Sequence, residues 1–300
     1  MTNKDKVLKF LALNSSKRFT NADIRASTGV SPHQQVFQIT RELVKTGRIR
    51  GQQFGHEWCF WIDSPESDEV TQKVKDAPTS ARQRPVYSLE LSSKTLLILP
   101  CSGAKRAGSE RCTEVSIMKT LDPAHFAALS EGRVALRKVA HINEQTLMPA
   151  YRRYSGYLYG QCEATLDSAV SDGQPILILS GGYGLLLANE PIGTYEKVFK
   201  LSDWPKGLLE SCILDYLRYA NIRSVIAVMS GTTDYARLVR RVNWRQAGAT
   251  ATLVSPISAG GGAMVKVPRA QGQAVSQLIN AELDDSWKSS DSLGLRIESL

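Results

Sequence analysis

Hydrophobic positions in the first sixty residues predict three helices followed by a hairpin. Apolar residues recur every three or four positions in residues 4–13 and 33–47, and a shorter helix over residues 22–28 follows candidate N-cap residues. Residues 48–62 form two strand-like runs around a turn that contains glycine. Three helices and a hairpin in this order predict a winged helix-turn-helix domain over residues 1–62.

The pattern changes after residue 62. Residues 63–93 mix charged residues, proline and serine without periodicity, so we expect a linker. Beyond it, continuous apolar runs alternate with helical stretches, and such runs indicate strands that are buried on both faces of a parallel sheet. The predicted strands are residues 95–100, 175–180, 224–230 and 249–256, and the predicted helices lie near residues 145–171, 206–220, 232–242 and 269–283. Residues 94–300 are therefore predicted to form an α/β domain, an open and mostly parallel four-stranded sheet with helices on both faces.

Most of the excess positive charge lies in the N-terminal part of the chain. Residues 1–62 contain ten Lys or Arg and four Asp or Glu, a net charge of +6, whereas the whole chain of 300 residues carries +8. In a helix-turn-helix protein the third helix enters the major groove of duplex DNA. The side chains on this helix that we expect to contact double-stranded DNA are Gln34, Gln35, Gln38 and Arg41. Winged helices also mediate protein contacts, so both interpretations stay open.

Loops rich in small residues follow the four predicted strands. Ligands of open α/β sheets bind beyond the carboxyl ends of the strands, where small residues let backbone N–H groups approach a phosphate. The side chains expected to bind a base or nucleotide there are Cys101, Ser102, Lys105, Ser180, Tyr183 and Tyr195. Neither a GxxxxGK[ST] loop nor a GxGxxG motif after a strand is present, which argues against ATP and dinucleotides. We expect no cofactor.

Two carboxylates are candidates for catalysis. Glu190 follows the second strand's loop and stands outside any run of charge, so it can position water or stabilise positive charge on a sugar. Asp234 lies at the end of the third strand. The alternatives are a solvated loop carboxylate for Glu190 and a helix N-cap for Asp234. Cys101 has no histidine near it in sequence, and we interpret it as a small residue that shapes its loop rather than as a nucleophile.

Tyrosine and arginine are concentrated in residues 148–160. This segment contains four tyrosines and two arginines, a mixture that suits stacking on bases and pairing with phosphates. We therefore expect Arg152 and Arg153 to contact DNA. An amphipathic helix with tyrosines at the edge of the core is the alternative interpretation.

Composition predicts a globular protein and a cytoplasmic location. Hydrophobic residues make up 42% of the chain and charged residues 22%, which is typical of a globular protein. The five cysteines form no CxxC motif and no cluster with histidine, so we expect reduced thiols and no metal. No apolar stretch approaches the roughly 20 residues of a membrane-spanning helix, and the N-terminus has no secretory signal. We expect a cytoplasmic protein without a membrane partner.

Three motifs carry a resemblance to known proteins. Pro-Cys-Ser-Gly-Ala-Lys at residues 100–105, Tyr-Ser-Gly at 154–156 and the segment from Ser180 to Glu196 together resemble the YaaA-like group of bacterial proteins. They are also similar to the uracil-DNA-glycosylase-like domain of archaeosine tRNA-guanine transglycosylases. The resemblance spans about residues 94–283 at the level of motifs. Together with the N-terminal domain, the plan is similar to that of bacterial antiphage DNA glycosylases that remove glucosylated hydroxymethylcytosine from phage DNA.

The resemblance implies a DNA glycosylase that flips a modified nucleotide into a pocket at the strand ends and hydrolyses its base–sugar bond. The implied pocket comprises Cys101, Ser102, Lys105, Ser180, Tyr183, Glu190, Tyr195 and Asp234. The chain departs from the uracil-DNA-glycosylase pattern in two places. Cys101-Ser102 replaces the water-activating Asp or Asn, and the His-Pro-Ser motif is missing. The alternatives are a non-enzymatic DNA-binding stress protein of the YaaA kind and a transcriptional regulator that senses a nucleotide.

Overall fold

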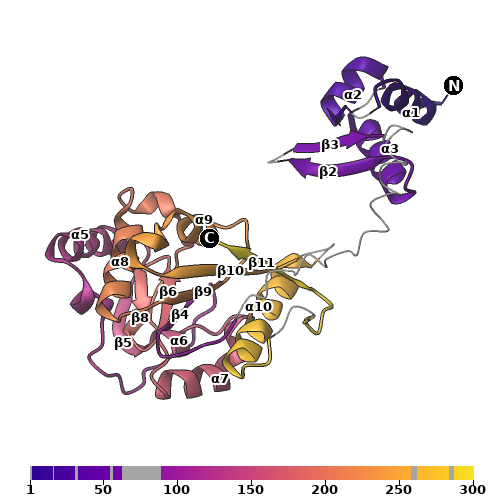
Figure 1. Ribbon diagram of the computed structural model, residues 1–300. Coiled ribbons are helices and arrows are strands. Elements are labelled where there is room, and N and C mark those ends of the chain that lie inside the picture. Colours follow the sequence, from indigo (N-terminus) through magenta and orange to yellow (C-terminus); the bar gives the residue numbers. More distant parts are fainter. Residues whose placement is uncertain are drawn as a thin grey trace. The chain divides into compact units, whose positions relative to one another are not determined.

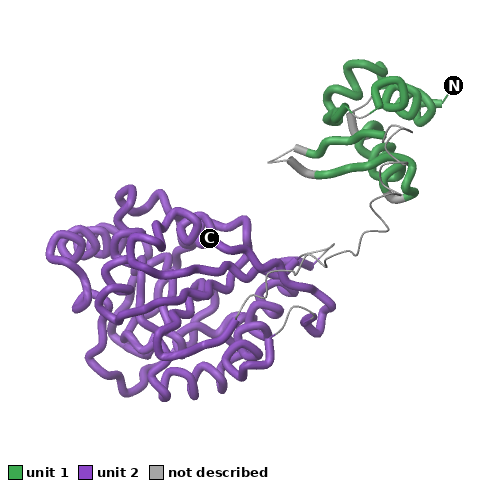
Figure 2. Tube along the Cα trace, in the orientation of Figure 1, with its two compact units in different colours: residues 1–86 green, residues 87–300 purple. Residues whose placement is uncertain are grey.

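The chain divides into two compact units, residues 1–86 and residues 87–300, shown in Figure 2. The computed structural model describes residues 2–15, 17–30, 33–54, 57–62, 89–257, 262–283 and 287–300. Most of the predicted linker, residues 63–88, lies outside the described residues. Each unit has its own core and is considered by itself.

The described residues of the first unit form three helices and a small antiparallel sheet. Its elements are α1 (Asn3–Leu13), β1 (Phe19–Thr20), α2 (Asn21–Thr28), α3 (His33–Lys45), β2 (Arg50–Phe54) and β3 (Glu57–Trp61), with sheet order β1-β3-β2. Thr2 and Thr20 form capping boxes with Asp5 and Asp23, which satisfies free N–H groups at the starts of α1 and α2. The apolar periodicity that predicted the helices supplies the core residues Val7, Leu11, Ile24, Val36, Ile39 and Leu43.

The second unit is a mixed α/β structure built on a six-stranded sheet. Its strand order is β11-β10-β9-β4-β6-β7 (Figure 1). The four parallel strands, β4 (Thr95–Pro100), β6 (Ile176–Ser180), β9 (Ser224–Val228) and β10 (Thr250–Pro256), are those expected from apolar runs. The prediction of four strands was wrong in number. Antiparallel strands β7 (Gly184–Leu187) and β11 (Leu295–Ser299) complete the edges.

Helices cover both faces of this sheet. Successive residues of a strand point to opposite faces, so Leu96 and Ile98 of β4 pack with α5 (Pro123–Val139), α8 (Leu208–Tyr219) and α9 (Asp234–Arg241). Leu97 and Leu99 pack on the other face, in a cluster with residues of α7 (Tyr159–Ser171) and α10 (Ala263–Ile279). Leu89, at the end of the predicted linker, is buried in the second cluster. Three 3-10 helices, η1 (Ile117–Thr120), η2 (Leu201–Asp203) and η3 (Trp244–Ala247), complete the unit.

The helix expected over residues 145–171 is only half correct. Its first part is strand β5 (Asn143–Pro149), which pairs with β8 (Pro191–Thr194) in a separate two-stranded sheet, followed by the short helix α6 (Ala150–Arg153). Most of β5 is exposed and Pro149 ends it, so the strand has no continuous apolar run by which to identify it. Helix α10 starts six residues before the predicted start at residue 269, with Pro268 inside its early turns.

None of the helices within the described ranges has the length and apolarity that crossing a membrane requires.

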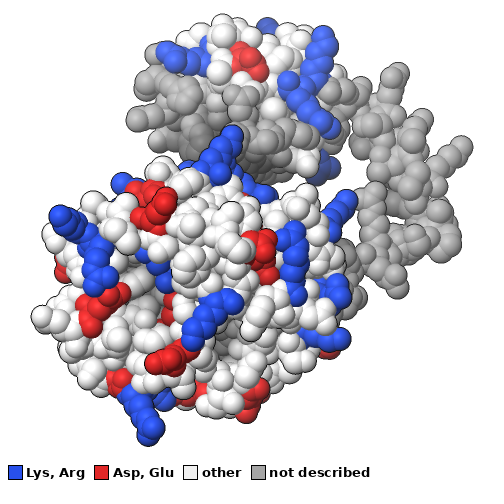
Figure 3. Space-filling model, turned by 90° about the vertical axis from the view of Figure 1, so that its left-hand side faces the viewer, with Lys and Arg blue, Asp and Glu red and all other residues white. Residues whose placement is uncertain are grey.

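The two units differ in charge. Residues 1–86 carry +5, because residues 1–62 carry +6 and residues 63–86 carry −1, whereas the much longer second unit, residues 87–300, carries +3. On the face of residues 87–300 that Figure 3 shows, basic and acidic side chains are interspersed. Electrostatic attraction of a polyanion is therefore stronger at the first unit.

Candidate functional site

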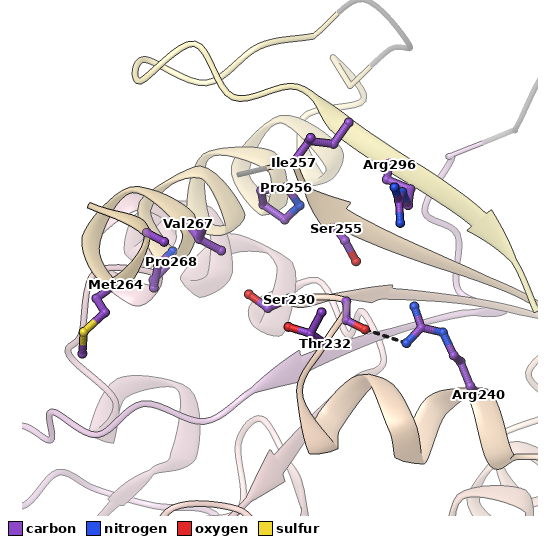
Figure 4. Close-up of a pocket in the computed structure, with 12 residues that line it drawn as sticks. Ser230, Thr232, Arg240, Ser255, Pro256, Ile257, Met264, Val267, Pro268 and Arg296 are labelled. Carbon is purple, nitrogen blue, oxygen red and sulfur yellow. Dashed lines mark hydrogen bonds between the residues drawn. The ribbon is translucent and has the colours of Figure 1, made fainter. Parts of the chain in front are cut away.

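Two adjoining cavities lie at the carboxyl ends of the parallel strands. The first cavity, of ≈ 780 Å³, is bordered by the end of β4, the loop after β9 and the start of α10; it is lined by Pro100, Cys101, Ser102, Gly103, Ala104, Ser155, Gly156, Tyr157, Leu158, Gly160, Gln161, Ser230, Thr233, Tyr235, Met264, Pro268 and Gln271. The second cavity, of ≈ 590 Å³, lies between β9, β10 and α10 and is shown in Figure 4. Ser230, Met264 and Pro268 line both, so the two form one continuous cleft.

The loop after β4 forms a wall of the first cavity together with residues 154–157. The N–H of Ser155 donates to the carbonyl of Ala104, and Lys105 and Tyr154 form a β-bridge. A Cβ atom at Gly156 would collide with the hydroxyl of Ser102, so the close approach of the two segments requires glycine. The motif residues that suggested a site therefore have a common structural role, which is to close this wall.

A hydrogen-bonded group of side chains lies at the base of the wall. The thiol of Cys101 is 3.1 Å from the hydroxyl of Tyr235. The hydroxyls of Tyr154 and Tyr195 are 2.8 Å apart, and Ser180 donates to Tyr195 over 3.0 Å. Burial raises the pKa of both Tyr154 and Tyr195 well above the ordinary value, so both phenols stay neutral. Cys101 and Tyr235 line the cavity, whereas the other three side chains lie behind it.

Lys105 does not line either cavity. Its ammonium group lies 3.8 Å from the ring centroid of Tyr195 and donates to the carbonyls of Ser102 and Gly103 over 3.3 and 3.2 Å. Burial lowers the pKa of this amine. Lys105 is not among the residues that line either cavity, so its contacts indicate that it stabilises the loop.

Of the six side chains expected to bind a base, only Cys101 and Ser102 line the first cavity. Tyr183 is buried, with its hydroxyl donating to Glu144 over 3.2 Å and accepting from the N–H of Gly193. Gln271 and Tyr235 are cavity residues that the sequence did not identify. Gln271 offers one signal, because it is a polar residue on an otherwise apolar stripe of α10 and is buried.

Glu190 lies at the opposite end of the sheet from the cavities. Strand β7 runs antiparallel to β6, so the chain returns to the amino end of β6 before it reaches Glu190, and Ala188 bonds to Ile176 there. The carboxylate is 4% exposed and accepts hydrogen bonds from Ser116, Arg133 and the N–H groups of Ile117 and Leu187. These contacts assign Glu190 a structural role rather than the catalytic role expected from its sequence position.

Asp234 is also separated from the cleft. It occupies the first turn of α9, where Thr233 provides the cap by accepting from the N–H of Ala236. Its carboxylate accepts from the N–H of Leu201 over 3.1 Å and pairs with Arg237 over 2.6 Å. It lines a third cavity of ≈ 360 Å³, beside η2. The two predicted catalytic carboxylates therefore do not come together, and neither lines the first cavity.

Arg153 and Arg152 do not offer free guanidinium groups to DNA. Arg153 is fully buried and donates to the carbonyls of Arg106, Gly108, Thr146 and Ile192. Arg152 pairs with Glu110 over 3.3 Å and with Asp167 over 2.8 Å. Arg153 therefore belongs to the core and does not contact DNA, because a buried guanidinium that bonds four carbonyls cannot reach a phosphate.

In the first unit, helix α3 exposes Gln38 and Arg41. Gln35 is half-buried and accepts a hydrogen bond from Asn3 over 3.0 Å. The side chain of Gln34 lies outside the described residues. Two of the four residues predicted to contact DNA are therefore available on one helix.

One group of described side chains has metal-ligand character. Asp122, His125 and Asp215 place ligand atoms within 4.8 Å of one another. Asp215 already accepts from the N–H of Asp122, contacts His125 Nδ1 at 2.6 Å and pairs with Arg218. None of these residues lines the first or second cavity.

No protein-family model matches this chain, and no curated protein matches its sequence.

Glu190→Gln is expected to destabilise the second unit. The glutamine amide carries no charge, so Arg133 would lose its buried counter-charge. Its NH₂ group would also face a group that is itself a donor, such as the N–H of Ile117. Together these changes are expected to lower the free energy of unfolding by about 2 kcal/mol or more. Denaturant unfolding measures this change. Unchanged stability combined with loss of a base-release activity would return Glu190 to a catalytic role.

Arg153→Met is expected to lower the free energy of unfolding by about 3 kcal/mol, because the fully buried guanidinium and its hydrogen bonds to four carbonyls are lost together. Arg152→Met is the matched control. Its ion pairs are partly exposed, so we expect a change of about 1 kcal/mol or less. Equal unfolding midpoints for both variants would contradict the role assigned to Arg153.

Proposed function

We propose that this chain is a DNA-binding N-glycosidase that hydrolyses the base–sugar bond of a modified nucleotide. The first unit would act as a winged helix-turn-helix domain, and the first cavity would receive the flipped nucleotide. The observation that carries the proposal is the cavity at the carboxyl ends of β4 and β9, with its lining of small and neutral polar residues.

The order of elements in the first unit supports DNA binding. The succession α1-β1-α2-α3-β2-β3 and the sheet order β1-β3-β2 support the proposed winged helix-turn-helix domain, because they match the order expected from the sequence. Helix α3 exposes Gln38 and Arg41, and residues 1–62 carry +6. A charge of this size attracts the phosphate backbone regardless of sequence.

The chemistry of the first cavity favours an uncharged ring over an anion. Its volume of ≈ 780 Å³ is within the range of small-molecule sites, about 300–1,000 Å³. Its described lining contains no Lys, Arg, Asp or Glu, but offers hydrogen bonds from Ser102, Tyr235 and Gln271. A nucleobase needs such neutral partners, and flipping it out of a duplex costs a few kcal/mol.

The lining also limits the mechanism. Because no carboxylate borders the first cavity within the described ranges, the proposed hydrolysis depends on stabilising the leaving base rather than on a general base. Hydrogen bonds from Tyr235 and Gln271 would hold the electron pair that the base takes when the C1′–N bond breaks. Water would then add to C1′ and lose a proton, the departed base would take up a proton in exchange for its negative charge, and an abasic site would remain. Such fixed donors lower the barrier only if they strengthen as negative charge develops on the base.

The same absence of a lining carboxylate favours a second candidate, a regulator that binds a nucleoside without cleaving it. A regulator would bind one DNA sequence in preference to others and change that preference when the nucleoside is bound.

Arg41→Ala is expected to weaken duplex binding and to reduce the slope of log affinity against log salt by about 0.9, the contribution of one phosphate contact. Fluorescence anisotropy at several salt concentrations measures this. Arg152→Ala should leave the slope unchanged, because Glu110 and Asp167 already bind its guanidinium. Equal slopes for wild type and Arg41→Ala would remove α3 from the proposed interface.

Gly103→Leu is expected to reduce base release by about tenfold or more, because a side chain at this open position would occupy the first cavity. The assay incubates protein with duplexes that carry different modified bases and cleaves abasic sites with alkali. Gly294→Leu, at an equally open position that does not line either cavity, should retain activity.

Failure of the wild type to release base from any modified duplex would exclude the enzyme. Stabilisation of that same protein by a nucleoside would then favour the regulator.

A further inference from the structure

The second cavity differs in chemistry from the first. Whereas the described lining of the first cavity is uncharged, the second is lined by Arg240 and Arg296. Ser230 stands where the two meet. A ligand with a neutral ring and an anionic substituent would therefore find a suitable environment for each part in one continuous cleft.

Ser255 lines the second cavity, and its unpaired hydroxyl is buried beneath the cavity surface. The residue is 6% exposed, and its Oγ has no hydrogen-bond partner among the described residues. Figure 4 shows the oxygen pointing toward the loop of Ser230 and Thr232. A Cβ atom at Gly231 would stand only 3.3 Å from this oxygen, so glycine keeps the space in front of it open. Burying an unpaired hydroxyl costs free energy, which a ligand oxygen would recover.

The loop after β9 is held rigidly beside Ser255. Arg240 donates to the carbonyl of Gly231 over 2.6 Å, drawn as a dashed line in Figure 4. The N–H groups of Gly231 and Thr232 make no hydrogen bond to any described residue. Consecutive backbone N–H groups before a helix are suitable donors for an anion.

One positive charge in the second cavity is not neutralised by an ion pair. Arg240 donates to both carboxylate oxygens of Glu298, over 2.9 and 2.7 Å. These bonds lower the pKa of Glu298, so the carboxylate stays ionised and the net charge of the Arg240–Glu298 pair is near zero. Arg296, on the neighbouring edge strand, is exposed and makes no ion pair with a described residue. Its guanidinium can therefore bind an anion without giving up an existing partner.

We infer that the second cavity is a phosphate subsite, which binds the phosphate attached to the nucleotide whose base occupies the first cavity. The assignment of the base rests on the proposed function, whereas the anion site rests on Ser255, Arg296 and the loop after β9. The substrate class that follows is a nucleotide rather than a nucleoside. The phosphate is either the diester of a DNA strand or the monoester of a free nucleotide.

Calorimetric titration of the full chain tests this subsite with four probes: 2′-deoxycytidine, 2′-deoxycytidine 5′-monophosphate, a short single-stranded oligodeoxycytidylate and inorganic phosphate. Arg296→Gln should weaken binding of the phosphate-bearing probes by about tenfold and leave 2′-deoxycytidine unaffected. Arg245→Gln, an exposed arginine outside both cavities, is the matched control and should bind every probe as the wild type does. Loss confined to the mononucleotide identifies a free nucleotide, and loss that includes the oligonucleotide identifies a strand phosphate.

Ser255→Ala provides a readout that a purely structural serine would not give. Because its hydroxyl has no partner, the variant should be as stable as the wild type, yet bind the phosphate probes about threefold more weakly. Wild-type phosphate affinity in both Arg296→Gln and Ser255→Ala would overturn the subsite, as would failure of the wild type to bind any phosphate probe. Phosphate binding without base release from modified DNA would instead reject the glycosidase and leave the subsite standing.

Discussion

The guanidinium group of Arg153 ties together the segments on which the cleft is built. It bonds the carbonyls of Arg106 and Gly108 in the loop after β4, of Thr146 in β5 and of Ile192 in β8. These bonds hold the loop beside the small sheet, together with backbone hydrogen bonds from Arg106 to Arg153 and from Glu110 to Leu147. With its far end held there, its near end can line the first cavity. Among the described residues, the first cavity is uncharged because the loop after β4 and residues 155–158 line it, whereas the second is charged because α9 and β11 supply Arg240 and Arg296.

The sequence predicted the parallel strands of the fold better than its edges. Continuous apolar runs identified β4, β6, β9 and β10, because strands buried on both faces carry mostly apolar residues. Strands β7 and β11 escaped detection for different reasons. Tight reversal after Ser180 makes β7 look like part of a glycine-rich loop, and β11 is short and half-exposed. Strand β5, exposed along most of its length, has no apolar signal of its own.

The candidate site was predictable in location but not in its side chains. Small-residue loops at strand ends correctly placed Cys101 and Ser102 on a cavity. Glu190 was misplaced because nearness in sequence to the end of β6 ceases to mean nearness in space once β7 reverses the chain. The burial of Arg153 could not be inferred, since the four carbonyls that it bonds come from three separate segments. Gln271 enters the cavity from a helix more than a hundred residues beyond the first motif, where only tertiary packing connects them.

The edge strand β11 has a consequence for how the cleft is assembled. Residues 295–299 pair with β10 and supply both Arg296 and Glu298, and Glu298 orients the arginine that holds Gly231. One wall of the second cavity is thus contributed by β11, which follows α10 in the sequence. During synthesis the first cavity can acquire all its described lining residues, which end at Gln271, before this strand has emerged. The lining of the neutral half is thus complete within residues 100–271, whereas the charged half also depends on residues 295–299, so a change confined to β11 alters the charge of the cleft without removing any lining residue of the first cavity.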